Sequence, residues 1–101
     1  MQGRLHKNAS GNNSYEIHKA DSEYIFEFAN VLRDCYEFGA VKRSSNPAYN
    51  FDCIFWDFQK DNILLTVGWD IWSGAFVFAH CSKGDEYIEK IATHFDNLLI
   101  R

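Results

Sequence analysis

The chain has little that marks an exported, membrane-bound or metal-binding protein. Its three cysteines are an odd number without Cys-x-x-Cys spacing, which predicts buried thiols in a reducing compartment instead of a disulfide framework. No apolar run approaches the roughly 18 residues of a membrane span, and the first residues lack the apolar segment of a signal peptide. We therefore expect a cytoplasmic protein with no membrane partner, no metal and no cofactor.

Positive charge is also scarce. Ten Lys and Arg stand against fourteen Asp and Glu, for a net charge of −4. The first nineteen residues carry more basic than acidic side chains, so the rest of the chain is the more acidic part. Non-specific nucleic-acid binding needs a basic face, and we expect no nucleic-acid partner. The acidic charge fits either simple solubility or electrostatic attraction of a basic protein.

Apolar and aromatic residues are abundant. They make up 47% and 17% of the 101 residues, respectively, enough to fill the core of one domain. Residues 1–13 show no periodicity and predict a flexible leader. The domain is then expected over residues 14–101. The single proline lies in an expected loop over residues 44–50.

The apolar periodicity predicts two helices and three main strands. The helices are expected from Asp21 or Ser22 to a left-handed stop at Gly39, and over 84–99 with a capping box between Ser82 and Asp85. The strands are expected over 51–59, 62–70 and 75–81, and weaker edge strands over 15–18 and 40–43. The order α-β-β-β-α predicts an α+β two-layer sandwich, an antiparallel meander of three or four strands with the N- and C-terminal helices on one face.

The strand register predicts two unequal sheet faces. A two-residue turn at Lys60-Asp61, with an even-numbered loop before Ala75, collects the large apolar residues, including Phe76 and Phe78, on the face beneath the helices. The second face then lacks Lys, Arg and Glu and predicts an interface. Its expected members are Phe51, Cys53, Phe55, Leu64, Thr66, Gly68, Val77 and Ala79. The alternative is that the leader or the loop at 40–50 covers this face.

The candidate catalytic groups are weak. Asp57 and Asp70 share the second face, but the expected register sets Asp57 against Leu64, far from Asp70. His80 is more simply a core histidine beneath a helix than a metal ligand with Cys53, Cys81 and His94. A nucleophile pair of Cys35 or Cys81 with His94 has no local sequence feature that would activate the thiol. The run from Gly68 to Gly74 holds two tryptophans around an aspartate. It predicts either an ordinary strand end or the lip of a small-molecule pocket lined by Tyr49, Asp70 and Trp72.

Two functional hypotheses follow. The leading one is a non-enzymatic protein-interaction module, a homodimer through the second face, with an acidic surface suited to inhibiting a basic protein. Bacterial immunity and inhibitor proteins include domains similar in size, charge and class, a likeness that transfers no residue. The alternative is a small-molecule-binding protein or enzyme with its pocket at the Trp69–Gly74 end of the sheet.

Overall fold

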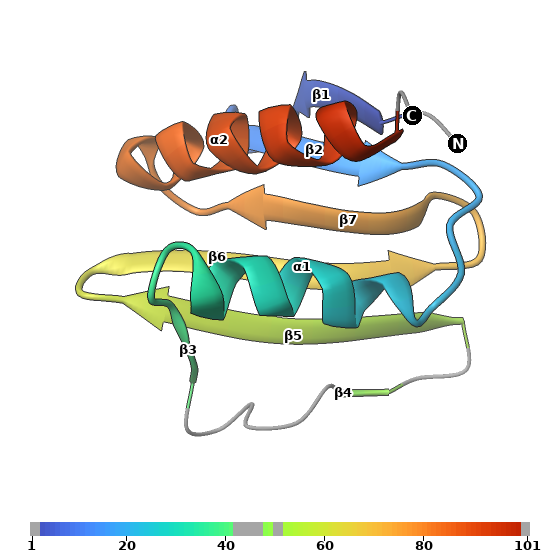
Figure 1. The fold of residues 1–101 in the computed structure, drawn as a ribbon, viewed down its shortest axis with the longest axis horizontal. Helices are drawn as coiled ribbons and strands as arrows, with labels where there is room; N and C mark the ends of the chain where they lie inside the picture. Colours follow the sequence, from blue (N-terminus) through green and yellow to red (C-terminus); the bar gives the residue numbers. More distant parts are fainter. Residues whose placement is uncertain (1–2, 42–47, 50–51, 100–101) are drawn as a thin grey trace.

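The computed structural model describes residues 3–41, 48–49 and 52–99. Within them the chain forms one antiparallel sheet with strand order β1-β2-β7-β6-β5-β3, and β4 pairs with β5. Both helices lie on the same side of this sheet (Figure 1), so the prediction of a mixed α+β fold is confirmed. The elements are β1 (Gly3–Lys7), β2 (Asn13–Ile17), α1 (Tyr24–Asp34), β3 (Gly39–Ala40), β4 (Ala48–Tyr49), β5 (Cys53–Lys60), β6 (Ile63–Asp70), β7 (Gly74–Ala79) and α2 (Ser82–Leu99).

The predicted flexible leader is wrong for residues 3–13. Gly3–Lys7 forms β1 and pairs with β2, so a hairpin precedes α1 and that helix lies mid-chain. Residues 15–18 were expected at a sheet edge, but β2 lies between β1 and β7. The predicted order α-β-β-β-α therefore lacked the β1–β2 hairpin before α1 and the short strands β3 and β4 after it.

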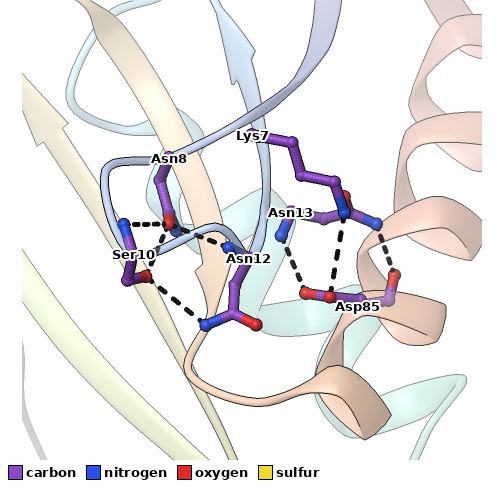
Figure 2. A network of polar contacts seen from close by, with 6 residues as sticks. All are labelled: Lys7, Asn8, Ser10, Asn12, Asn13 and Asp85. Atoms are coloured by element: carbon purple, nitrogen blue, oxygen red, sulfur yellow. Dashed lines mark hydrogen bonds and ion pairs between the residues drawn. The ribbon is translucent and has the colours of Figure 1, made fainter.

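Polar contacts hold the β1–β2 hairpin in place (Figure 2). The Asn8 side-chain oxygen accepts hydrogen bonds from the N–H of Ser10, at 3.0 Å, and from the N–H of Asn12, at 3.2 Å. The carboxylate of Asp85 in α2 accepts the Asn13 N–H at 2.7 Å, and the Asn13 amide donates to the Asp85 carbonyl at 3.2 Å. Apolar periodicity gives no sign of this hairpin because polar side chains hold its turn and connect it to α2.

The start of α2 and the end of α1 also differ from the ends predicted by capping residues and apolar periodicity. Asp85 engages Asn13, 72 residues away, so the predicted capping box with Ser82 is not formed. The chain leaves α1 with Glu37 in the left-handed region, at φ 62°, and the N–H of Phe38 donates to the Leu32 carbonyl at 2.9 Å. Gly39, the expected stop, is instead the first residue of β3.

The β5–β6 hairpin turns one residue later than predicted. Lys60 pairs with Ile63, which leaves Asp61-Asn62 as the two-residue turn, and Asp61 adopts a φ of 53°. Each residue of β5 therefore faces a partner two positions further along β6 than expected. A shift of two leaves every side chain on its predicted face because side chains alternate with a period of two.

The β6–β7 connection reverses the predicted faces of β7. Asp70 pairs with Gly74, so the loop has three residues, Ile71 to Ser73. An odd number places Val77 and Ala79 beneath the helices, where they are 0% and 1% exposed, and brings Phe76 and Phe78 to the opposite face. The predicted faces of these four residues are therefore wrong.

The core lies between the sheet and the two helices. α2 packs on β1, β2 and β7, and α1 on β6 and β7. The rings of Phe28 and Phe95 join the two helices at a centroid distance of 4.7 Å. The fully buried Tyr15 of β2 contacts both rings, and its hydroxyl donates to the Asp96 carboxylate at 2.7 Å. Among the described residues, this core and both helices lie on one side of the sheet, and no described helix covers the other face (Figure 1).

Candidate functional site

The candidate site is the sheet face opposite the helices, which we call the open face. Two cross-strand rows run across it from β1 to β5, as the strand pairing requires. The first row contains Arg4, Glu16, Phe76, Gly68 and Phe55. The second row contains His6, Ser14, Phe78, Thr66 and Asp57.

An aromatic strip crosses the open face. Its members are Phe55, Phe76, Phe78 and His80, with centroid distances of 6.1 Å, 6.1 Å and 5.2 Å between successive rings. Gly68 lies between Phe55 and Phe76 in the first row, and a Cβ there would meet the Phe76 ring and lie 2.9 Å from the Ile54 carbonyl oxygen. Phe55 remains 44% exposed. Because Gly68 has no side chain, the Phe76 ring lies close to the backbone at this position, and the apolar surface there is shallow.

A polar chain adjoins this strip. The Thr66 hydroxyl donates to the Asp57 carboxylate at 2.7 Å, and the Nε2 atom of His80 lies 2.8 Å from the same hydroxyl oxygen. Since the Thr66 proton goes to Asp57, Nε2–H of His80 is the donor in the second bond. In a catalytic triad the acid orients the histidine, which accepts the proton of the nucleophile. Here both groups bind the hydroxyl itself, so the arrangement fixes side chains and does not activate a nucleophile.

The two ends of the rows differ in charge. On the β1 side, Arg4 pairs with Glu16 at 3.0 Å, and His6 Nε2 lies 3.8 Å from the same carboxylate oxygen. The Arg4 side chain is 70% exposed, whereas that of Glu16 is 18% exposed, so the guanidinium is the group presented to solvent. On the β5 side the row ends in Asp57. The open face thus has a basic edge and an acidic edge with aromatic rings between them.

The structure reassigns part of the predicted interface. Strand pairing places Cys53, Phe55, Leu64, Thr66 and Gly68 on the open face, whereas Val77 and Ala79 are core residues and Phe51 lies outside the described residues. Five further residues of the open face were not predicted there: Phe76, Phe78, His80, Arg4 and Glu16. Gly74 was the sequence feature that could have indicated the correct faces of β7, because a glycine at this position allows a three-residue loop before the strand.

The predicted small-molecule pocket is also rearranged. Asp70 Oδ1 accepts the N–H groups of Trp72 and Ser73, at 2.9 Å and 2.5 Å, and so holds the loop. Trp72 is 70% exposed. It borders an open groove of about 780 Å³, and a second depression of about 560 Å³ that also includes Asp70. The Tyr49 side chain lies outside the described part of the structure. The groove is lined by Gly3, Arg4, Glu16, His18, Lys19, Trp72 and Ser73.

The remaining candidate groups do not converge. Asp57 faces Thr66, not Leu64, and Asp70 follows four residues along β6, roughly 13 Å away at the usual rise per residue. His80 is exposed on the open face, so its expected place beneath a helix is wrong. Cys35 is exposed and the other two thiols are half-buried, which corrects their expected burial. Within the described ranges, no three His, Cys, Asp or Glu residues are arranged to hold a metal.

No described helix is long and apolar enough to cross a membrane. Comparison of the chain with protein-family models, curated protein sequences and solved structures gave no match. Functional inference therefore depends on the geometry of the open face and of the groove beside Trp72.

Proposed function

We propose that the chain is a non-enzymatic protein-interaction module that binds a second copy of itself through the open face. The observation that carries this proposal is the aromatic strip on the side away from both described helices. Phe55 alone leaves 44% of its surface in water, and apolar surface of this kind on a regular sheet face is typical of an interface.

The charge pattern of the open face supports a second copy of the chain as the partner. β7 is the middle strand of β1-β2-β7-β6-β5. A twofold axis along β7 would set the β1 edge of one copy over the β5 edge of the other. Arg4 would then face the partner's Phe55, a cation–π pairing, and His6 would face the partner's Asp57. Phe76 and Phe78 would meet their own copies at the centre.

The size of the face sets the expected strength. Five strands about 4.8 Å apart give a width of roughly 20 Å, which is small for a permanent dimer interface. We therefore expect a concentration-dependent dimer and not an obligate one. The net charge of −4 also favours a basic protein as a further partner of the same surface, in keeping with the inhibitor hypothesis.

Sedimentation velocity over a range from low-micromolar to near-millimolar protein tests the proposal. Phe55→Lys should abolish the dimer, because it replaces the ring with an ammonium group that faces the partner's Arg4 at both edges of the interface, and it should leave the circular dichroism spectrum unchanged. Phe26→Lys is the matched control, since Phe26 is 43% exposed but belongs to α1. Arg4→Glu should weaken the dimer by placing like charges at facing edges.

The sedimentation experiment has three distinguishable outcomes. Loss of the dimer in Phe55→Lys, with retention in Phe26→Lys, supports association through the open face. A monomer at every concentration contradicts the dimer. Equal loss in both variants shows that the contact lies elsewhere.

A further inference from the structure

The groove beside Trp72 has a rigid aromatic wall. The loop that carries Trp72 is held by two hydrogen bonds to Asp70 and by Gly74, whose φ is +85°. Trp72 nevertheless exposes 70% of its surface. A large aromatic side chain on a constrained loop can stack on a planar ligand at little conformational cost.

The opposite wall of the groove is equally well fixed. Lys19 adopts a φ of 66° in the tight turn after β2, where the Ala20 N–H donates to the Ile17 carbonyl at 3.2 Å. The Ala20 carbonyl in turn accepts the indole N–H of Trp69 at 2.9 Å. The backbone on both sides of the groove is therefore positioned before any ligand arrives.

The groove is basic in an acidic chain. Arg4, His18 and Lys19 line it, and Glu16, the one carboxylate among its described lining residues, is paired with Arg4. The adjoining depression shares His18, Lys19 and Trp72 with the groove and adds Asp21 and Asp70. The groove lacks these two aspartates and has Arg4 instead, so it is the more favourable of the two for an anion.

We propose that this groove binds a small planar aromatic anion of mononucleotide size. The ring of the ligand stacks on Trp72, and its anionic group lies between Lys19, His18 and the exposed Arg4 guanidinium. The volume of about 780 Å³ is in the range of small-molecule sites, roughly 300–1,000 Å³. The groove shares Arg4 and Glu16 with the first row of the open face, whereas Trp72 and Lys19 belong to neither row. Variants of Trp72 and Lys19 therefore test the groove without changing the proposed dimer contacts.

Titration of 15N-labelled protein by NMR tests the site with four probes: AMP, adenosine, inorganic phosphate and indole-3-acetate. AMP should shift the resonances of Lys19, Trp72 and Ser73 saturably. Adenosine and phosphate, which each lack one half of the recognised chemistry, should bind about tenfold more weakly or worse. If indole-3-acetate matches AMP, the site recognises aromatic carboxylates as well as phosphates.

Two pairs of variants locate the binding. Trp72→Ala should weaken AMP binding about tenfold or more, whereas Ile71→Ala, which truncates an exposed neighbour in the same loop, should not. Lys19→Ala should also weaken it, and Lys83→Ala, an exposed lysine of α2, should leave it unchanged. Each variant is first checked for an unchanged amide spectrum outside its own loop.

The proposal is overturned if AMP produces no saturable shift at millimolar concentration. It is also overturned if AMP binds Trp72→Ala and Lys19→Ala as tightly as the unchanged protein. Tighter binding of a short single-stranded oligonucleotide, with shifts spread over the open face, would likewise replace the groove by an extended nucleic-acid surface.

Discussion

The two faces of the sheet are built from the same strands but meet different surroundings. Along β7, Val77 is fully buried beneath the helices, whereas its neighbours Phe76 and Phe78 lie on the open face. The covered face is filled by aliphatic and aromatic side chains. The open face alternates rings with Arg4, Glu16, Thr66 and Asp57. The comparison shows that side-chain size does not identify the core side of this sheet, since the large phenylalanines of β7 face away from the helices.

The largest expected effect separates the two faces directly. Val77→Glu should prevent folding, because an unpaired carboxylate at a fully buried position costs about 5 kcal/mol or more, comparable to the stability of a small domain. Phe55→Glu should remain folded. Circular dichroism and urea titration of both variants measure the difference, and a stably folded Val77→Glu protein would contradict the assignment of the faces.

The loop that sets the faces of β7 gives the next effect. Gly74→Ala should cost about 3 kcal/mol, because it adds the strain of a left-handed backbone to a collision of the new Cβ with the Ile17 carbonyl oxygen. Gly11→Ala is the control, since Gly11 has φ +86° but no atom within 4 Å of a Cβ. It should cost about 1 kcal/mol. Equal losses in thermal or urea unfolding would show that the close approach at Gly74 is unimportant.

A smaller effect concerns the buried phenol of the covered face. Burial, and then the hydrogen bond to the Asp96 carboxylate, raises the pKa of Tyr15 above its ordinary value of 10.0. Above about pH 10 the unfolded chain loses this proton while the folded chain keeps it, so stability should fall as pH rises. Tyr15→Phe should lose about 1 kcal/mol at neutral pH and show a shallower alkaline decline in unfolding midpoint. An unchanged slope would exclude Tyr15 as its source.

The smallest effect tests the polar chain of the open face. Thr66→Val keeps the side-chain shape but removes the hydroxyl between Asp57 and His80. Water can solvate both freed groups, because Asp57 is half-buried and His80 is exposed. We expect a loss below about 1 kcal/mol in urea unfolding and a changed His80 ring signal by NMR. A loss as large as that of Gly74→Ala would show that the open face is covered in solution.

Much of the architecture was predictable. Two apolar stripes, one through Ile25, Phe28 and Leu32 and the other through Ile88, Ile91 and Phe95, predicted both helices, and all six residues are buried. The three long strands were predicted within two residues at each end, because their apolar residues recur over whole elements. The β1–β2 hairpin was not, because Asn8 and Asp85 position it through polar contacts that leave no periodic pattern.

The candidate site was less predictable for a related reason. Phe55, Leu64 and Gly68 were placed on the correct face even though the β5–β6 pairing was off by two residues, since an even shift preserves the faces. The faces of β7 were predicted wrongly because a loop of odd instead of even length reverses every side chain that follows it. The residues affected are Val77, Ala79, Phe76 and Phe78. The basic edge of the open face was not predicted because β1, the strand that carries Arg4 and His6, was not predicted.

The sequence by itself determined the mixed α+β composition, the apolar stripe of each helix and the alternation along each strand, because these depend on residues close together in the chain. Only the tertiary structure decided which side of β7 meets the helices, where Arg4 and Glu16 lie and how Trp72 borders a groove with Lys19. Those features depend on the length of one loop and on contacts between residues far apart in the sequence, which local patterns do not specify.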